Sequence, residues 1–308
     1  MSNIEESKFS EIINILNKYD ISVQVEEFIQ SEQDAILIDP LNYYMNQNRY
    51  NKHSVLGIDI YRYSKYPELQ QYMIPVIFKE LYRIAVGFCI IYEPFVFQKF
   101  KDDDFNNSFI STGDGGFQIF PTPIHALIFT IYFEASLRAF NLFCHYPKLR
   151  SYLGEISLRY TLTYDNIFHF DHNFFGPAII NNSRILSKDH LNRFLIDAST
   201  YGWFLKKTGG VETLLNYDVE RLSKISDFKD YDNSFIEKKH LLFPTKYDSK
   251  KSIRLINVQK VGLLDVKGDT VDIHSVYIQV DLSLLAESTI KEKKDFILSL
   301  GNTNSSGI

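Results

Sequence analysis

The sequence predicts an α+β fold in which helices flank a mainly antiparallel sheet. Its apolar segments follow one another in the order strand, helix, hairpin, helix, strand and helix. The hairpin is the clearest of these signals, because Asp114–Gly115 joins two apolar runs and Asp-Gly is typical of the tight turn between paired strands. A chain that mixes a hairpin with helices in this way favours an antiparallel sheet over a purely parallel one.

The first strand and the first long helix are expected before the hairpin. Residues Ser54–Ile60 are apolar and rich in β-branched side chains, which is typical of a buried strand. Asp59 lies near the C-terminal end of this run, where the chain would leave the sheet. A helical pattern follows from about Glu68 to Tyr92, and Pro75 inside it marks a kink or a boundary.

The hairpin is expected after a polar loop that opens at Asp102–Asp104. Phe109–Ser111 enters the hairpin and Phe117–Phe120 returns from it, so Asp114 lies in the turn. A helix is expected from Pro123 to about His145, followed by a strand over Ser157–Tyr164. A further helix starts at Gly176-Pro177 and carries Arg184. Two or more strands are expected between Val261 and Val280, around a turn at Lys267.

The composition divides the chain into three parts. Residues 1–50 form an N-terminal helical or extended segment, and residues 51–284 form the main domain. Residues 285–308 end in a polar stretch rich in Gly, Ser and Asn, which predicts a flexible tail. The charged, irregular stretch Tyr217–Lys251 is expected to be an insertion or a boundary, because it offers no second core.

Charge and cysteine content exclude several classes of protein. The 308 residues include 33 Lys and Arg against 38 Asp and Glu, and this net charge of -5 argues against a general nucleic-acid binder. The two cysteines cannot build a disulfide scaffold, and they fit a reducing compartment. The acidic N-terminus and the short apolar runs predict a cytoplasmic protein with no membrane span.

Two carboxylates are the candidate chemistry of this sequence. Asp59 ends the first strand and Asp114 lies in the hairpin turn, so adjacent antiparallel strands can bring them side by side. Such a pair forms an oxygen-rich site that suits Mg²⁺ or Mn²⁺, and backbone amides after Asp59 can cradle phosphate. A site that binds both metal ions and phosphates indicates phosphoryl transfer. The alternative is that each aspartate is only a turn or cap residue without a metal.

Three segments resemble the class III nucleotide cyclases. Asp59–Ser64 (DIYRYS) resembles the first metal motif of that family, and Ser111–Phe117 (STGDGGF) resembles its Gly-Asp hairpin. Phe175–Arg184 (FGPAIINNSR) resembles the helix motif that ends in a catalytic arginine. The resemblance extends over about Ser54–Val280. It implies a class III cyclase-like fold with a ferredoxin-like core, in which residues 51–284 are the nucleotide cyclase catalytic domain.

The reaction that this resemblance implies is attack of the ribose 3′-hydroxyl on the α-phosphate of a nucleoside triphosphate, with release of pyrophosphate. Asp59, Asp114 and Arg184 are the implied catalytic residues. Two Mg²⁺ or Mn²⁺ ions per active site would be held by the two aspartates and the backbone carbonyl of Ile60. The resemblance also implies a head-to-tail homodimer, in which the aspartates act with Arg184 of the other protomer.

The resemblance also assigns contacts to the triphosphate. Tyr63 and Ser64 belong to the first metal motif, and Lys267 belongs to a Val-Lys-Gly segment that is a weaker fourth match. The helix motif departs from the family pattern, because purine cyclases usually carry an Asn four residues before the catalytic arginine. That position is Ile180 here. Either the asparagines that follow it supply the amide after a shift, or the contact is absent.

The base-reading positions also differ from those of purine cyclases. They are Ile110 and Asn173 here, and the lack of a charged reader weighs against ATP and GTP, because a site that hydrogen-bonds a base needs matched groups. The Asn173 amide offers both a donor and an acceptor to a pyrimidine edge. Arg49 and Tyr50, just before the first strand, are further candidates for contacts to the base.

Within the family the chain resembles most the bacterial pyrimidine cyclases of the Pycsar antiphage system, on Ser111–Phe120, Thr122–Ala126 and Gly176–Ile180. This resemblance implies conversion of UTP, or of CTP, to cyclic UMP or cyclic CMP, which would activate a separate effector protein during phage infection. Two alternatives stay open. One is a purine nucleotide cyclase with unusual base contacts, and the other is an inactive cyclase homologue that binds nucleotide as a sensor. No nucleic-acid or membrane partner is expected.

Overall fold

A computed structural model describes residues 52–170, 173–248, 251–266, 269–281, 297–304 and 306. Its helices and strands confirm the expected α+β class, with a mostly antiparallel sheet flanked by helices. The predictions made for residues 1–50, which include Arg49 and Tyr50, and the one made for Lys267 lie outside the described residues.

The elements follow the expected order through the first half of the described chain. These are β1 (Lys52–Ile60), α3 (Glu68–Tyr92), α4 (Asp102–Asn107), β2 (Phe109–Ser111), β3 (Gly115–Phe120), α5 (Pro123–Asn141), α6 (Pro147–Leu153) and β4 (Leu158–Asn166). The second half forms β5 (Phe168–Phe170), β6 (Asn173–Phe175), α7 (Pro177–Lys188), β7 (Phe194–Asp197), α8 (Ala198–Thr208), β8 (Ile253–Val266), β9 (Asp269–Asp281) and β10 (Ile297–Leu300).

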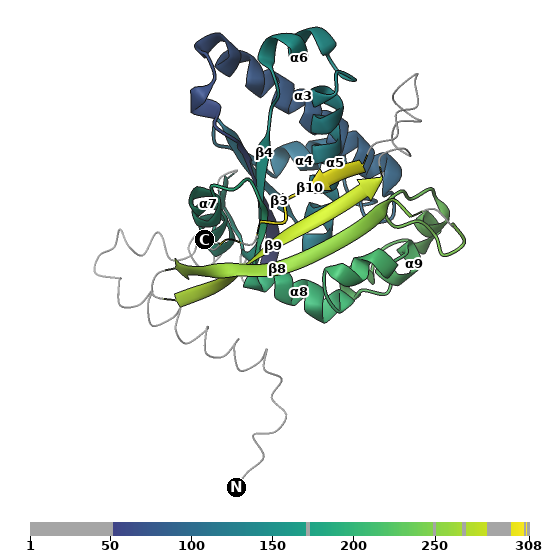
Figure 1. Cartoon of the computed structure of the whole chain (residues 1–308). Helices are drawn as coiled ribbons and strands as arrows, with labels where there is room; N and C mark the ends of the chain where they lie inside the picture. The colour runs from purple at the N-terminus through teal and green to yellow at the C-terminus, as the bar shows by residue number, and fades with distance from the viewer. Residues whose placement is uncertain are drawn as a thin grey trace, which may run out of the picture. The chain divides into compact units, whose positions relative to one another are not determined.

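One large sheet organises these elements (Figure 1). Its strand order is β10-β9-β7-β4-β1-β3-β2, and β8 pairs with β9. The segment β1-α3-β2-β3-α5-β4 forms a ferredoxin-like unit, in which the strand order β4-β1-β3-β2 is antiparallel throughout. Strands β4 and β7 form the one parallel pair among the described strands. Within these residues, none of the helices combines the length and apolar character that a bilayer span requires.

Strand β1 lies at the centre of the ferredoxin-like unit and is covered on both faces. Leu56 and Ile58 belong to the main core, which also contains residues of α3, α5 and α8. Val55 packs instead with Ala178 of α7, on the opposite face. Burial on both faces explains why this strand is apolar almost throughout. Because side chains alternate along a strand, Asp59 shares the α7 face and lies at the end where β1 leaves the sheet.

Two expectations are wrong. Asp102–Asp104 begins α4 rather than a loop, and all three acidic residues fall in the first turn, where carboxylates interact favourably with a helix N-terminus. Part of the expected C-terminal tail is a strand, because Ile297–Leu300 forms β10 and pairs antiparallel with β9. Leu298 and Leu300 are buried there, so two apolar side chains stabilise a segment that is otherwise polar.

Within the irregular stretch Tyr217–Lys251, the described apolar residues pack on the main core, and no separate core is found among them. Glu93, at the C-terminal end of α3, anchors it. One carboxylate oxygen of Glu93 accepts hydrogen bonds from the Leu241 and Leu242 amides, at 3.2 and 2.6 Å, and from the Tyr132 hydroxyl, at 2.9 Å. The stretch and the residues before it form the short helices η2 (Glu212–Asn216), α9 (Val219–Leu222), η3 (Ser226–Phe228) and η4 (Asn233–Glu237).

A buried aspartate between β7 and α8 makes the stability depend on pH. Asp197 is the N-cap of α8 and accepts a hydrogen bond from the Thr200 amide at 2.8 Å, but burial raises its pKa to about 6. The folded state therefore binds this proton more tightly than the unfolded state does. Below about pH 4 both states are protonated and there is no penalty, and above pH 6 the full penalty applies.

We expect Asp197→Asn to stabilise the protein at pH 8 by about 1–3 kcal/mol, because Asn keeps the cap and carries no charge. The gain should shrink as the pH falls toward 4, and urea unfolding at a series of pH values measures it. Asp197→Ala is the control, because it loses the cap as well as the charge. A gain that does not vary with pH would contradict this explanation.

Candidate active site

The structure brings Asp59 and Asp114 to the same end of the sheet. Asp59 lies opposite Gly115 in the pairing of β1 with β3, and the next amide, that of Ile60, donates to the carbonyl of Asp114 at 2.8 Å. The pKa of Asp59 is raised by burial and by the charge of Asp114, although Arg159 opposes both. The two carboxylates are therefore close enough to interact electrostatically.

Two carboxylates are a suitable donor set for a metal ion that binds together with phosphates. Among the described residues, no group of three His, Cys, Asp or Glu side chains converges. Mg²⁺ is usually held by one or two carboxylates and completes its octahedral shell with water and substrate phosphates. The pair Asp59 and Asp114, with the carbonyl of Ile60 beside them, fits that pattern and does not fit an all-protein cage.

Arg159 is the main residue of this site that the sequence did not reveal. It lies on β4 directly opposite Asp59, and its Nε and Nη2 donate to Oδ2 of Asp59 at 2.8 and 2.6 Å. Its Nη1 donates to the backbone carbonyl of Asp189. Oδ1 of Asp59 receives no hydrogen bond from the described residues, so this oxygen is available to a cation. The signal in the sequence was an arginine near the start of the expected strand Ser157–Tyr164.

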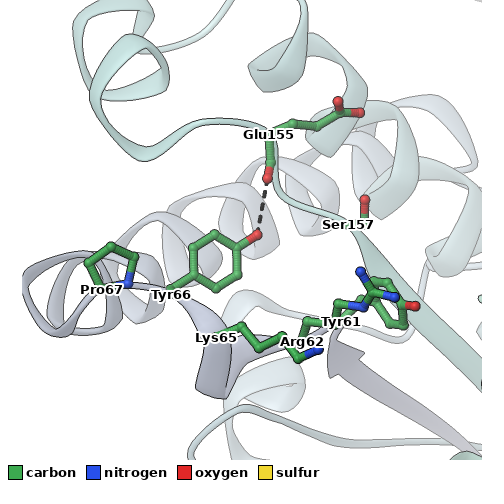
Figure 2. A pocket seen from close by; sticks show the side chains of 7 residues that line it. All are labelled: Tyr61, Arg62, Lys65, Tyr66, Pro67, Glu155 and Ser157. Carbon is green, nitrogen blue, oxygen red and sulfur yellow. Dashed lines mark hydrogen bonds between the residues drawn. The ribbon is translucent and has the colours of Figure 1, made fainter.

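The turn after Asp59 presents amides and cations. Arg62 has left-handed backbone angles (φ 58°, ψ 34°), which are uncommon for a residue other than glycine. Turns of this kind expose consecutive N–H groups that bind anions, and the amides of Tyr63 and Ser64 have no acceptor among the described residues. Arg62 and Lys65 line a cavity of about 360 Å³ beside this turn, and Glu155 and Ser157 lie across from them (Figure 2).

Tyr63 and Ser64 occupy different environments in this turn. Ser64 is exposed. The hydroxyl of Tyr63 donates to the backbone carbonyl of Gln71 in α3 at 2.7 Å, so it is not free for a nucleotide. What Tyr63 can offer to a phosphate is its backbone amide.

Of the two expected base-reading positions, Ile110 and the neighbour of Asn173 contact the same apolar cluster. Ile110 of β2 and Phe174 of β6 both pack against the cluster that contains Val55 and Ile119. Asn173 precedes Phe174 and is exposed, and its side-chain Oδ1 accepts a hydrogen bond from the Phe174 amide at 2.8 Å. Ile110 is thus part of an apolar cluster and the Asn173 amide is exposed, and their contact with a base stays a prediction.

Arg184 lies on α7 and makes no contact with the two aspartates among the described residues. Its Nη1 is buried among these residues without a hydrogen-bond partner. Asn182 is buried and donates to the carbonyls of Val55 and Thr161, at 2.7 and 2.9 Å, so it docks α7 on the sheet and cannot replace the missing amide at Ile180. Its neighbour Asn181 is partly exposed, so its amide is accessible to a ligand.

Gly57 allows α7 to approach β1 this closely. A Cβ at Gly57 would lie 1.9 Å from Oδ1 of Asn182, so a side chain there must displace the helix.

We expect Gly57→Ala to lower the free energy of unfolding by about 1–3 kcal/mol, as overpacking does. Gly87→Ala in α3 is the matched control: its Cβ meets nothing within 4 Å, and it should stabilise by up to about 1 kcal/mol. Equal urea midpoints for the two variants would contradict this explanation.

Among known proteins, this chain is similar to several solved structures. No protein-family model matches the sequence, and no curated protein matches it. The chain is similar to the adenylyl cyclase CyaB from P. aeruginosa, with 13% identity over 74% of this chain and 94% of that chain and a TM-score of 0.41. The guanylate cyclase domain of RhGC from Catenaria anguillulae in complex with GTP is 14% identical over 74% and 96%, with a TM-score of 0.42.

An adenylate/guanylate cyclase/hydrolase from Silicibacter pomeroyi is 12% identical to the chain, over 74% of this chain and 97% of that chain, with a TM-score of 0.40. Similarities at this level of identity and TM-score carry no weight on function. The function proposed below therefore rests on the residues of this chain and on the motifs that they form.

Proposed function

We propose that the chain is a class III nucleotide cyclase that converts UTP, or CTP, to the 3′,5′-cyclic monophosphate and pyrophosphate. The observation that carries this proposal is that the pairing of β1 with β3 brings Asp59 and Asp114 to the same end of the sheet, beside a turn that offers free amides and the cations Arg62 and Lys65. Carboxylates next to an anion-binding turn suit a substrate that brings phosphates to a divalent metal. By resemblance to the Pycsar cyclases, the product would activate a separate effector protein.

The proposed reaction needs mainly positioning and charge from the protein. The ribose 3′-oxygen bonds to the α-phosphorus, the bond from that phosphorus to the oxygen bridging to the β-phosphate breaks, and the hydroxyl proton passes to solvent. Two Mg²⁺ or Mn²⁺ ions, when bound, would polarise the hydroxyl and neutralise phosphate charge. Asp59, Asp114 and the carbonyl of Ile60 would hold them, while Arg62 and Lys65 would bind the terminal phosphates.

Arg159 would have two roles in the proposed site. Without a cation it holds Asp59 in place through two hydrogen bonds to a single carboxylate oxygen. The ion pair would weaken when Asp59 holds a cation, because the cation and the Arg159 guanidinium would share the same negative charge. The guanidinium is planar and has five donors, so it can then bind the oxygens of an incoming phosphate.

The preference for a pyrimidine is proposed from Ile110 and Asn173. Neither side chain carries the charge that a purine reader supplies, and Ile110 belongs to an apolar surface. Oδ1 of Asn173 is occupied by the Phe174 amide, which leaves the side-chain N–H₂ group as the available donor. A donor at this position matches the O4 carbonyl of uracil better than the amino group of cytosine, so UTP is the preferred substrate in this proposal.

A homodimer is proposed because the site is incomplete within one chain. Arg184 has a buried guanidinium nitrogen without a partner, and buried donors are normally satisfied. Helix α7, which carries Arg184, exposes Ile180, and the β5–β6 hairpin that precedes it in the chain exposes Phe170 and Phe175. Exposed apolar groups gathered near one functional residue are typical of a surface that contacts another protein. A second copy on this surface would bring its own carboxylates to Arg184.

The direct test is to incubate the purified protein with Mn²⁺ or Mg²⁺ and each of ATP, GTP, CTP and UTP, and to identify products by mass spectrometry. Cyclic UMP or cyclic CMP is the expected product. Cyclic AMP or cyclic GMP would overturn the pyrimidine assignment in favour of a purine cyclase. Nucleotide binding without any cyclic product would indicate an inactive homologue that acts as a sensor.

A further inference from the structure

A proline inside α3 leaves one backbone carbonyl of that helix without its usual donor. Pro75 has no N–H group, so the bond that residue 75 would make to the carbonyl of Gln71, four residues earlier, cannot form. The hydroxyl of Tyr63 takes the place of that donor, at 2.7 Å from the Gln71 carbonyl oxygen. The donor thus comes from the turn that follows Asp59, outside the helix.

Gln71 also holds the far end of the same turn. Its side-chain Nε2 donates to the backbone carbonyl of Tyr66 at 2.7 Å. Tyr66 in turn donates its hydroxyl to the carbonyl of Glu155 at 3.0 Å, a bond drawn in Figure 2. The turn is therefore attached to α3 at two points and to the loop before β4 at a third.

These attachments explain how a strained turn persists. Arg62 lies immediately before Tyr63 and has left-handed backbone angles, which cost free energy in a residue other than glycine. Such a conformation is kept where the surrounding contacts fix it on both sides. The same turn, which follows Asp59 in the chain, carries the amides and the two cations, Arg62 and Lys65, that line the cavity.

We propose that Tyr63, Gln71 and Pro75 are positioning residues for this turn, and that Pro75 acts by withholding a backbone donor from α3. A proline in a helix interior destabilises the helix, so its presence calls for a compensating gain. Here the gain is a carbonyl that is free to anchor the turn four residues after Asp59. The kinetic part of this inference rests on the proposed function, whereas the attachment itself does not.

The decisive variants are Tyr63→Phe and Pro75→Ala. Tyr63→Phe removes one hydroxyl, and Pro75→Ala restores an N–H that competes for the Gln71 carbonyl. We expect both to lower kcat/KM for UTP by about tenfold or more, because misplacing bound phosphates by about 1 Å lowers the rate up to about 100-fold. Pro75→Ala should nevertheless raise Tm, since it repairs the helix. The double variant should be no slower than the slower single variant, because both changes break one contact.

Tyr72→Phe is the matched control. Tyr72 lies one residue after Gln71 and is exposed, and its hydroxyl contacts only Glu68 of the same helix among the described residues, at 3.5 Å. This variant should leave both kcat/KM and Tm unchanged. A loss of activity in Pro75→Ala that is accompanied by a lower Tm would overturn the proposal, because general destabilisation would then account for the loss.

Hydrogen exchange of the peptide that contains residues 61–66 tests the attachment without any reference to catalysis. Tyr63→Phe and Pro75→Ala should both increase amide exchange there, and Tyr72→Phe should not. Unchanged exchange in both variants would overturn the proposal, and so would faster exchange with unchanged kcat/KM. If the wild-type chain forms no cyclic nucleotide, the proposed function fails on its own, and UTP binding measured by calorimetry replaces kcat/KM as the second readout.

Discussion

Asp59→Asn and Asp114→Asn are each expected to reduce the formation of cyclic nucleotide by about 10³-fold. The two aspartates are the carboxylates that meet at the end of β1, and no third His, Cys, Asp or Glu joins them within the described residues. A neutral amide is a poor ligand for Mg²⁺ or Mn²⁺, so either change removes half of the charged ligands from the proposed site. Product formation from UTP with Mn²⁺, followed by mass spectrometry, gives the measurement.

Stability measurements separate the two variants. Asp59 is partly buried and paired with Arg159, so Asp59→Asn leaves a partly buried guanidinium without its counter-charge and should destabilise the fold by about 1–3 kcal/mol. Asp114 is exposed, and its replacement should change stability by less than about 0.5 kcal/mol. Asp103→Asn, in the exposed first turn of α4, makes the same change of charge on another element; it should leave activity unchanged and lower stability by less than about 1 kcal/mol, because it removes one of three carboxylates at a helix N-terminus.

Near-normal activity in Asp114→Asn would contradict the metal site, since that variant keeps its fold. Manganese binding, followed by electron paramagnetic resonance, gives a second readout that does not depend on turnover. Both aspartate variants should bind Mn²⁺ more weakly than the wild type does, and Asp103→Asn should bind it equally well. Equal binding by all of these proteins would show that the carboxylates do not hold the ion.

The sequence predicted those parts of the fold whose signals are local. The bounds of α3 agree with the helical pattern from Glu68 to Tyr92, and the Asp-Gly turn placed the β2–β3 hairpin correctly. Strand β1 was predicted because it is buried on both faces and therefore apolar along its length. In each case a single window of residues carries enough information to fix the element.

Features that depend on distant residues were missed. Strand β7 has four residues, is fully buried and pairs in parallel with β4, so it shows no alternation. Strand β10 is stable because it pairs with β9 and buries two leucines, which a short polar sequence does not reveal. The ion pair of Arg159 with Asp59 joins residues 100 positions apart, so the pairing of β1 with β4 had to be known first.

The residues of the candidate site also fall into two groups, those with a local signal in the sequence and those that depend on tertiary contacts. The carboxylates were found because each follows a strand signal, and an aspartate at a strand end is visible in the sequence. The link from Tyr63 to the Gln71 carbonyl was not found, although Pro75 was recognised as a break in the helix. A proline shows that a carbonyl is free, but the identity of the group that binds this carbonyl is set by tertiary structure.

Mixing two inactive variants is expected to restore activity if the active site is shared between protomers. Arg184→Ala should be nearly inactive, as Asp59→Asn is, because each loses one part of the site. In a two-fold dimer formed from both chains, one site contains both lesions and the other contains neither. About half of the dimers are mixed after free exchange, and each has one intact site, so about a quarter of wild-type activity should return.

The matched control is a mixture of Asp59→Asn with Asp114→Asn. These two residues belong to the same half of the proposed site, so every site in every dimer keeps one lesion and no activity should return. Recovery in the first mixture and none in the second would place Arg184 across the interface from the aspartates. No recovery in either mixture, with exchange verified by differently tagged chains, would contradict the shared site. Arg184 would then have to act within its own chain, where its Nη1 has no hydrogen-bond partner among the described residues.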